Sequence, residues 1–85
     1  MNAWTIAKDL IAEPGALPGT NRNAVGLTGP RNNKLTAAQI ESHPDAKPFR
    51  ILDDDGTLYY EGFLIGDETA PLDDFGEPNA GCTRI

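Results

Sequence analysis

The sequence of 85 residues contains a single cysteine, Cys82, and a single histidine, His43. One cysteine excludes an internal disulfide, on which small secreted domains usually depend. Structural zinc sites take about four Cys or His ligands, and nothing in the sequence places Cys82 beside His43 as a catalytic pair. We interpret Cys82 as a small core residue and His43 as an exposed residue at the end of a helix. We therefore expect a cytoplasmic protein without a metal or cofactor.

The sequence also has no long hydrophobic run. No stretch approaches the roughly 18 apolar residues that cross a bilayer. At the start of the sequence no basic residues precede an apolar segment, and Lys8 and Asp9 interrupt the apolar residues there. We therefore expect no signal peptide, no membrane segment and no membrane partner.

Basic residues are scarce in the second half of the chain. Residues 51–85 contain nine acidic residues and one basic residue, whereas residues 1–50 contain four acidic and six basic ones, and the net charge is −6. An acidic surface repels phosphates, which argues against direct binding to nucleic acid or to anionic lipid. The same distribution is typical of a solvated surface that keeps a small protein soluble.

The composition indicates a single small globular domain over residues 1–85. Hydrophobic residues make up 39% of the sequence, which is enough for one modest core. Nine glycines and seven prolines predict that much of the chain forms turns and loops.

A β-hairpin over residues 48–66 is the clearest predicted element. Residues 49–53 and 57–65 are rich in β-prone side chains, and the Asp55-Gly56 pair between them is typical of a two-residue turn. The cross-strand pairs that follow from this turn are Arg50–Glu61, Ile51–Tyr60 and Leu52–Tyr59. The residues that then share the core face are Phe49, Ile51, Leu58, Tyr60 and Leu64. A three-residue loop with a bulge at Gly56 is the alternative, and it shifts the pairs by one residue.

Two shorter strands precede the hairpin in the predicted order. Residues 4–11 alternate as a strand with Trp4, Ile6 and Leu10 on one face, although a helix competes there. Residues 24–28 predict a second, short strand that is weakened by its central glycine. Residues 82–85 resemble the beginning of another strand.

A short helix over residues 37–42 is predicted from its N-terminal signals. Thr36 and Gln39 have the spacing of a capping box, and Leu35 and Ile40 occupy the positions of a hydrophobic staple. Pro44 ends the helix, because the residue before a proline avoids the α conformation. The predicted fold is therefore α+β, with an antiparallel sheet of four to five short strands and one short helix.

Two turn-like motifs resemble ligand sites but lack the required spacing. With Gly56 at the sixth position of a calcium loop, the first position is Ile51 and the twelfth is Gly62 instead of a glutamate. Residues 26–31 lack the Gly-Lys-Ser/Thr ending of a phosphate-binding loop, although nearby basic side chains offer an anion contact. We interpret both motifs as ordinary turns and predict that the protein is not an enzyme.

Residues 66–81 show no periodicity and are predicted to form a long acidic loop. Loops of this length in compact domains are often functional or disordered. The candidate partner-binding residues in it are Leu72, Asp73, Asp74, Phe75 and Glu77. Packing of Leu72 and Phe75 on the core is the structural explanation for the same pattern.

The predicted function is that of a small non-enzymatic interaction or regulatory module. It binds a protein partner through the acidic loop or through a sheet edge. The first alternative is an acidic inhibitor that mimics nucleic acid in a basic groove of its target. The second alternative is a small metal-dependent enzyme.

Overall fold

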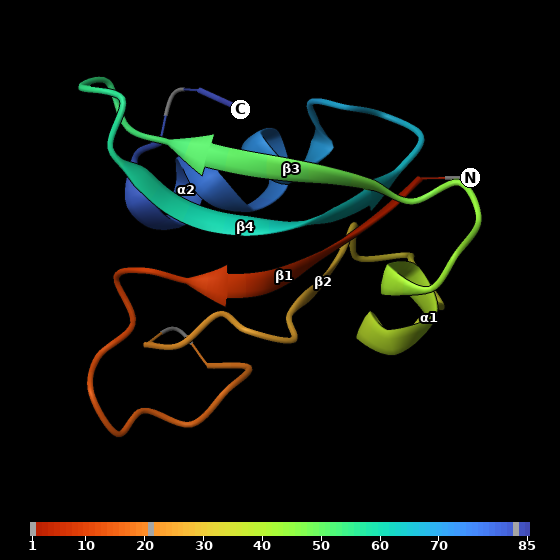
Figure 1. Cartoon of the computed structure of the whole chain (residues 1–85), viewed down its shortest axis with the longest axis horizontal. Helices are drawn as coiled ribbons and strands as arrows, with labels where there is room; N and C mark the ends of the chain where they lie inside the picture. The colour runs from red at the N-terminus through yellow and green to blue at the C-terminus, as the bar shows by residue number, and fades with distance from the viewer. Residues whose placement is uncertain (1, 21, 83) are drawn as a thin grey trace.

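The fold combines a four-stranded antiparallel sheet with short helical pieces (Figure 1). The computed structural model describes residues 2–20, 22–82 and 84–85. In chain order the elements are β1 (Ala3–Asp9), β2 (Thr28–Gly29), α1 (Ala37–Glu41), β3 (Lys47–Leu52), β4 (Leu58–Ile65), the π-helical turn η1 (Leu72–Gly76) and α2 (Glu77–Ala80). The strands lie in the order β2-β1-β4-β3. The predicted α+β fold is therefore confirmed.

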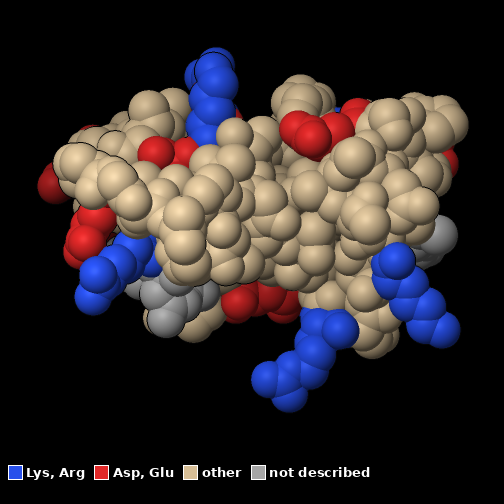
Figure 2. Space-filling view, turned by 90° about the horizontal axis from the view of Figure 1, so that it is seen from below, with Lys and Arg blue, Asp and Glu red and all other residues tan. Residues whose placement is uncertain are grey.

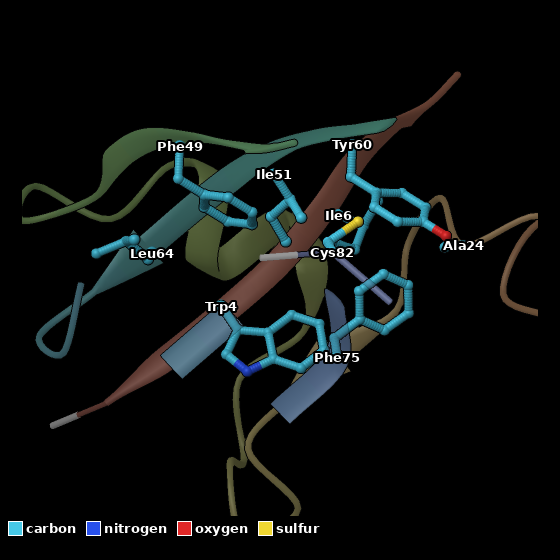
Figure 3. Close-up of a cluster of buried hydrophobic side chains, with 9 residues drawn as sticks. All are labelled: Trp4, Ile6, Ala24, Phe49, Ile51, Tyr60, Leu64, Phe75 and Cys82. Carbon is cyan, nitrogen blue, oxygen red and sulfur yellow. The ribbon is translucent and has the colours of Figure 1, made fainter. Parts of the chain in front are cut away.

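Each face of the sheet packs against a different part of the chain. One face builds the larger core, which comprises Trp4, Ile6, Ala24, Phe49, Ile51, Tyr60, Leu64, Phe75 and Cys82 (Figure 3). On the opposite face, Ala3 and Ile65 of the sheet pack against Ile40 of α1 in a smaller cluster. The two-residue alternation of β1 and β4 explains this division, because neighbouring residues point to opposite faces.

A bulge in β1 changes which residues face the core. Ile6 pairs with Gly62 and Lys8 pairs with Glu61, so Ala7 is an extra residue in the ladder. The bulge turns Lys8 away from the core, whereas simple alternation placed it beside Trp4 and Ile6. The prediction that Leu10 shares their face is wrong, because β1 ends at Asp9 and Leu10 is 55% exposed.

The second predicted strand is displaced along the chain. β2 comprises only Thr28 and Gly29, which pair with Thr5 and Trp4. Gly26 and Leu27 do exchange hydrogen bonds with Ile6, at 2.8 and 3.0 Å. Gly26 has a φ of +89°, which is incompatible with a regular strand, so the strand begins later than the sequence predicts.

The predicted capping box forms at the start of α1. The Gln39 N–H donates to Thr36 Oγ1 at 3.2 Å, and the Thr36 N–H donates to Gln39 Oε1 at 2.8 Å. Leu35 packs against the cluster that contains the fully buried Ile40, as the staple prediction requires. The helix ends at Glu41, one residue earlier than predicted.

The hairpin has features of both predicted turns. The pairs Arg50–Glu61 and Ile51–Tyr60 are confirmed, but Leu52 pairs with Leu58 and not with Tyr59. The turn is the three-residue alternative, since the Asp53 N–H donates to the Thr57 carbonyl at 3.0 Å and Gly56 has a φ of +81°. A bulge at Tyr59 then restores the register that the two-residue turn predicts.

The segment 66–81 is the main correction to the predicted fold. It is not an aperiodic loop, because η1 and α2 form within it and lie behind the sheet in Figure 1. Gly76 fits closely against the sheet, since an added Cβ would lie 2.8 Å from Ile51 Cγ2. Contact with the sheet therefore organises a segment that has no helical pattern of its own.

Beyond α2 the chain returns to the outer edge of β3. Leu52 and Arg84 form an antiparallel bridge, which agrees with the predicted beginning of a strand over 82–85. Among the described residues no helix is long and apolar enough to cross a membrane.

Candidate protein-binding surface

The five predicted partner-binding residues lie on η1 and at the start of α2. Phe75 is only 6% exposed and packs against Trp4 and Tyr60, with ring centroids 5.6 and 4.8 Å away. Leu72 is half-buried against the same core. These contacts are the ones expected if Leu72 and Phe75 hold the segment on the sheet.

The acidic residues of the candidate set differ in their surroundings. Asp74 Oδ2 accepts a hydrogen bond from the Trp4 indole Nε1–H at 3.1 Å, although the residue is exposed overall. Asp73 and Glu77 are also exposed and extend into solvent on the same segment. Only part of the predicted acidic surface therefore remains available to a partner.

Other acidic side chains stabilise local backbone turns. Asp53 Oδ1 accepts from the N–H groups of Asp55 and Thr57 at 2.9 and 2.8 Å. Asp67 Oδ1 accepts from the Thr69 N–H and hydroxyl at 2.9 and 2.8 Å, and these bonds lower the pKa of Asp67. These are the roles that short carboxylates usually have in turns.

The described residues offer no catalytic or metal-binding cluster. No group of three His, Cys, Asp or Glu side chains within them is arranged to hold a metal ion. Cys82 is fully buried in the larger core, where burial raises the pKa of its thiol. His43 follows α1 on the opposite side of the sheet, and its Nδ1 accepts from the Asp45 N–H at 3.0 Å.

A groove of about 690 Å³ opens where α1 leaves the sheet uncovered. α1 packs on β1 and β4, and the groove runs from there across β3 to its outer edge. Pro48 and Phe63 are cross-strand neighbours that contribute apolar surface, and Ile85 lies at the far end. The groove therefore joins an apolar sheet surface to an open strand edge.

A row of charges crosses the sheet within this groove. Glu61 lies between Arg50 and Lys8, with Glu61 oxygens 3.4 Å from Arg50 Nε and 3.7 Å from Lys8 Nζ. Both basic side chains are 71% exposed, compared with 28% for Glu61. The Glu61 carboxylate thus forms ion pairs with both basic side chains, and both of these remain largely exposed to solvent.

The outer edge of β3 already accepts one residue in antiparallel pairing. The Leu52 N–H donates to the Arg84 carbonyl at 2.9 Å, and the Arg84 N–H donates to the Leu52 carbonyl at 3.2 Å. Since backbone groups alternate along a strand, the Arg50 N–H and carbonyl and the Pro48 carbonyl also point outward. In the described part of the chain no strand pairs with this outer edge, and the Leu52–Arg84 bridge is its one backbone pairing.

A second exposed surface lies on the loop that follows β1. Leu10, Ile11 and Leu17 are exposed there, and the face in Figure 2, seen from below, carries few charges across its centre. Asp9 holds this loop in place by accepting from the N–H groups of Ile11 and Ala24 at 3.0 and 2.8 Å. The described residues of this loop include neither an open strand edge nor a row of charges like that in the β3 groove.

Sequence reasoning named no residue of the β3 groove as a binding residue, although it predicted one contact within it. Arg50 and Glu61 were predicted to pair, and Pro48 within a strand is itself a signal of a sheet edge. Lys8 was missed because only the bulge in β1 brings it opposite Glu61. Comparison with protein-family models, with curated proteins and with solved structures finds no match.

Proposed function

We propose that this protein is a non-enzymatic interaction module that binds an extended segment of a partner protein along the edge of β3. The observation that carries the proposal is the Leu52–Arg84 bridge, in which this edge already pairs with one residue. The outward backbone groups of Arg50 and Pro48 come next along the same edge. An extended segment placed there lies beside the groove, so its side chains reach both the apolar surface and the row of charges.

The side chains of β3 favour selective binding over general aggregation. Lys47, Pro48 and Arg50 are all exposed on this strand. Charged residues and proline on an edge strand discourage indiscriminate strand pairing, because they repel like edges or remove a donor. An edge of this kind accepts a segment only if its charge and spacing fit.

The short edge predicts a weak complex. Arg50 and Pro48 together offer three outward backbone groups, and each net hydrogen bond contributes about 1 kcal/mol. Apolar contact with Pro48 and Phe63 adds to this total. A dissociation constant on the order of micromolar to millimolar follows, as is usual for small transient interfaces.

A peptide with single N-methyl groups tests edge binding directly. A random ten-residue peptide library, displayed in many copies so that avidity reveals weak binding, would first supply a binding peptide. In strand addition, alternate amides of that peptide point towards β3 and away from it. We expect N-methylation to weaken binding at two residues spaced two positions apart, whose N–H groups donate to the Arg50 and Pro48 carbonyls, and to have little effect at the residue between them. Uniform effects along the peptide, or a library without binders, would overturn the proposal.

A further inference from the structure

We infer that the bound segment has an acidic residue opposite Arg50 and an apolar residue two positions later, opposite Pro48. This inference rests on the proposed function and adds the chemistry of the partner. It commits to a segment of another protein that runs antiparallel to β3.

The Arg84 bridge sets the direction and register of that segment. Arg84 is antiparallel to Leu52 and exchanges both backbone hydrogen bonds with it. A segment that continues this register exchanges the same two bonds with Arg50 and donates one to the Pro48 carbonyl. Pro48 has no N–H to offer, so the ladder ends there. The contact therefore spans a short stretch of the partner.

The charges in the groove select an acidic residue opposite Arg50. Directly paired residues in an antiparallel ladder share one face, so this side chain lies beside the Arg50 guanidinium. Glu61 already divides its charge between Arg50 and Lys8, and the remaining pair in the groove joins Lys47 to Glu68 at 3.5 Å. Three cations against two carboxylates leave one excess positive charge among these side chains.

The apolar position follows from the neighbours of Pro48. Pro48 pairs with the half-buried Phe63, and both lie on the face that α1 covers only in part. A residue opposite Pro48 shares that face and extends the apolar surface of these two side chains. Because an antiparallel partner passes Arg50 before Pro48, the acidic residue precedes the apolar one by two positions.

A second copy of this chain fits the same edge poorly. Two antiparallel β3 edges would bring the exposed Lys47 and Arg50 side chains of both copies close together. Like charges on directly paired residues destabilise a strand pair. Pro48 would also be duplicated, which removes a donor from each side.

Defined peptides separate this inference from the function on which it rests. The probes are capped eight-residue peptides of alternating Thr and Val that differ at two positions. The first position is Glu, Gln or Lys, and the second, two residues later, is Val or Ser. Their affinities would be measured by amide chemical-shift titration, which detects complexes as weak as the order of millimolar. We expect the Glu and Val peptide to bind best, and its Lys counterpart roughly three- to tenfold more weakly at low ionic strength.

Charge reversal in the protein provides the matched control. Arg50→Glu should reverse the preference for the Glu peptide, so that the Lys peptide binds better. Arg50→Gln places no second negative charge beside Glu61 and should abolish the preference between the Glu and Lys peptides. Lys34→Glu makes the same change of charge at an exposed residue outside the groove and should leave the preference intact.

The possible outcomes have distinct meanings. If no peptide binds, the proposed function fails together with this inference. If the Glu, Gln and Lys peptides bind equally well, edge binding stands and the acidic specificity is wrong. If concentrated protein without peptide shows the same amide shifts at β3, a second copy occupies the edge and the inference is overturned.

Discussion

At the scale of single residues, Trp4 connects the two ends of the chain. Its ring packs on Phe75, its indole donates to Asp74, and Gly29 lies directly beside the ring. β1 is thereby joined to β2 on one side and to η1 on the other. Trp4 is also the only tryptophan, so its fluorescence reports on this junction.

Replacing Gly29 with alanine should destabilise the protein. An added Cβ would overlap the Trp4 ring, so either the ring or β2 must move. We expect Gly29→Ala to lower the free energy of unfolding by about 1–3 kcal/mol, measured by urea denaturation. Thr28→Ala, a change at the exposed neighbouring residue, is the control and should have a smaller effect. Equal stabilities of wild type and Gly29→Ala would contradict the close contact.

The Asp74 carboxylate should contribute to stability through Trp4. Asp74→Ala removes the acceptor of the indole hydrogen bond and should cost about 1 kcal/mol. Asp74→Asn keeps an acceptor oxygen and should cost less. Asp73→Ala removes an exposed neighbour with the same charge, and we expect it to change stability little in the same denaturation experiment. Equal losses for the two alanine variants would mean that the hydrogen bond is unimportant.

Tyr60 should make stability fall at high pH. Burial is the largest cause that raises its pKa to about 12 from an ordinary value of 10.0. Between these values the unfolded chain loses the phenol proton while the folded protein retains it, so stability is lost as pH rises from about 10 to about 12. Tyr60→Phe should reduce this slope, measured by urea denaturation across that range.

The comparison variant for this pH dependence is Tyr59→Phe. The pKa of Tyr59 is also raised, chiefly by the negative charge of Asp53, but the side chain is less buried than that of Tyr60. Its removal should reduce the slope less. A slope unchanged in Tyr60→Phe would show that the phenol of Tyr60 is not the titrating group.

At the scale of elements, local signals were predictable and long-range contacts were not. The capping box of α1 depends on residues three apart, so the sequence contains all of it. The helical turn η1 depends on contacts of Phe75 and Gly76 with residues of the sheet far away in sequence. For the same reason the bulge at Ala7 could not be foreseen, and the pairing of Lys8 with Glu61 was not predicted.

The α1 cap provides a test of the local signal. Thr36→Ala removes the side-chain acceptor at the helix start and should lower stability by about 1 kcal/mol, measured by thermal unfolding. Gln39→Glu preserves a side-chain acceptor for the Thr36 N–H and should have a smaller effect. If both variants unfolded at the same temperature as the wild type, the capping box would not contribute to stability.

At the scale of the whole molecule, the distribution of charge matters more than its sum. The chain carries a net charge of −6, yet the groove beside β3 has more basic than acidic side chains. The net charge of the whole sequence does not reveal this local excess of basic side chains, because Lys8, Arg50 and Glu61 come from three different strands. The acidic-mimic and metal-dependent-enzyme alternatives stay predictions, whereas the β3 edge has a backbone bridge that supports its proposed role.

Hydrogen exchange at the Arg50 amide tests the central claim most directly. In the free protein this N–H points away from β4, whereas those of Phe49 and Ile51 point towards it. We expect saturation with the Glu and Val peptide to slow exchange at Arg50 and to leave exchange at Phe49 and Ile51 nearly unchanged. Unaltered exchange at Arg50, together with peptide-induced amide shifts at Asp73 and Glu77, would place binding on the segment 66–81 and contradict the account.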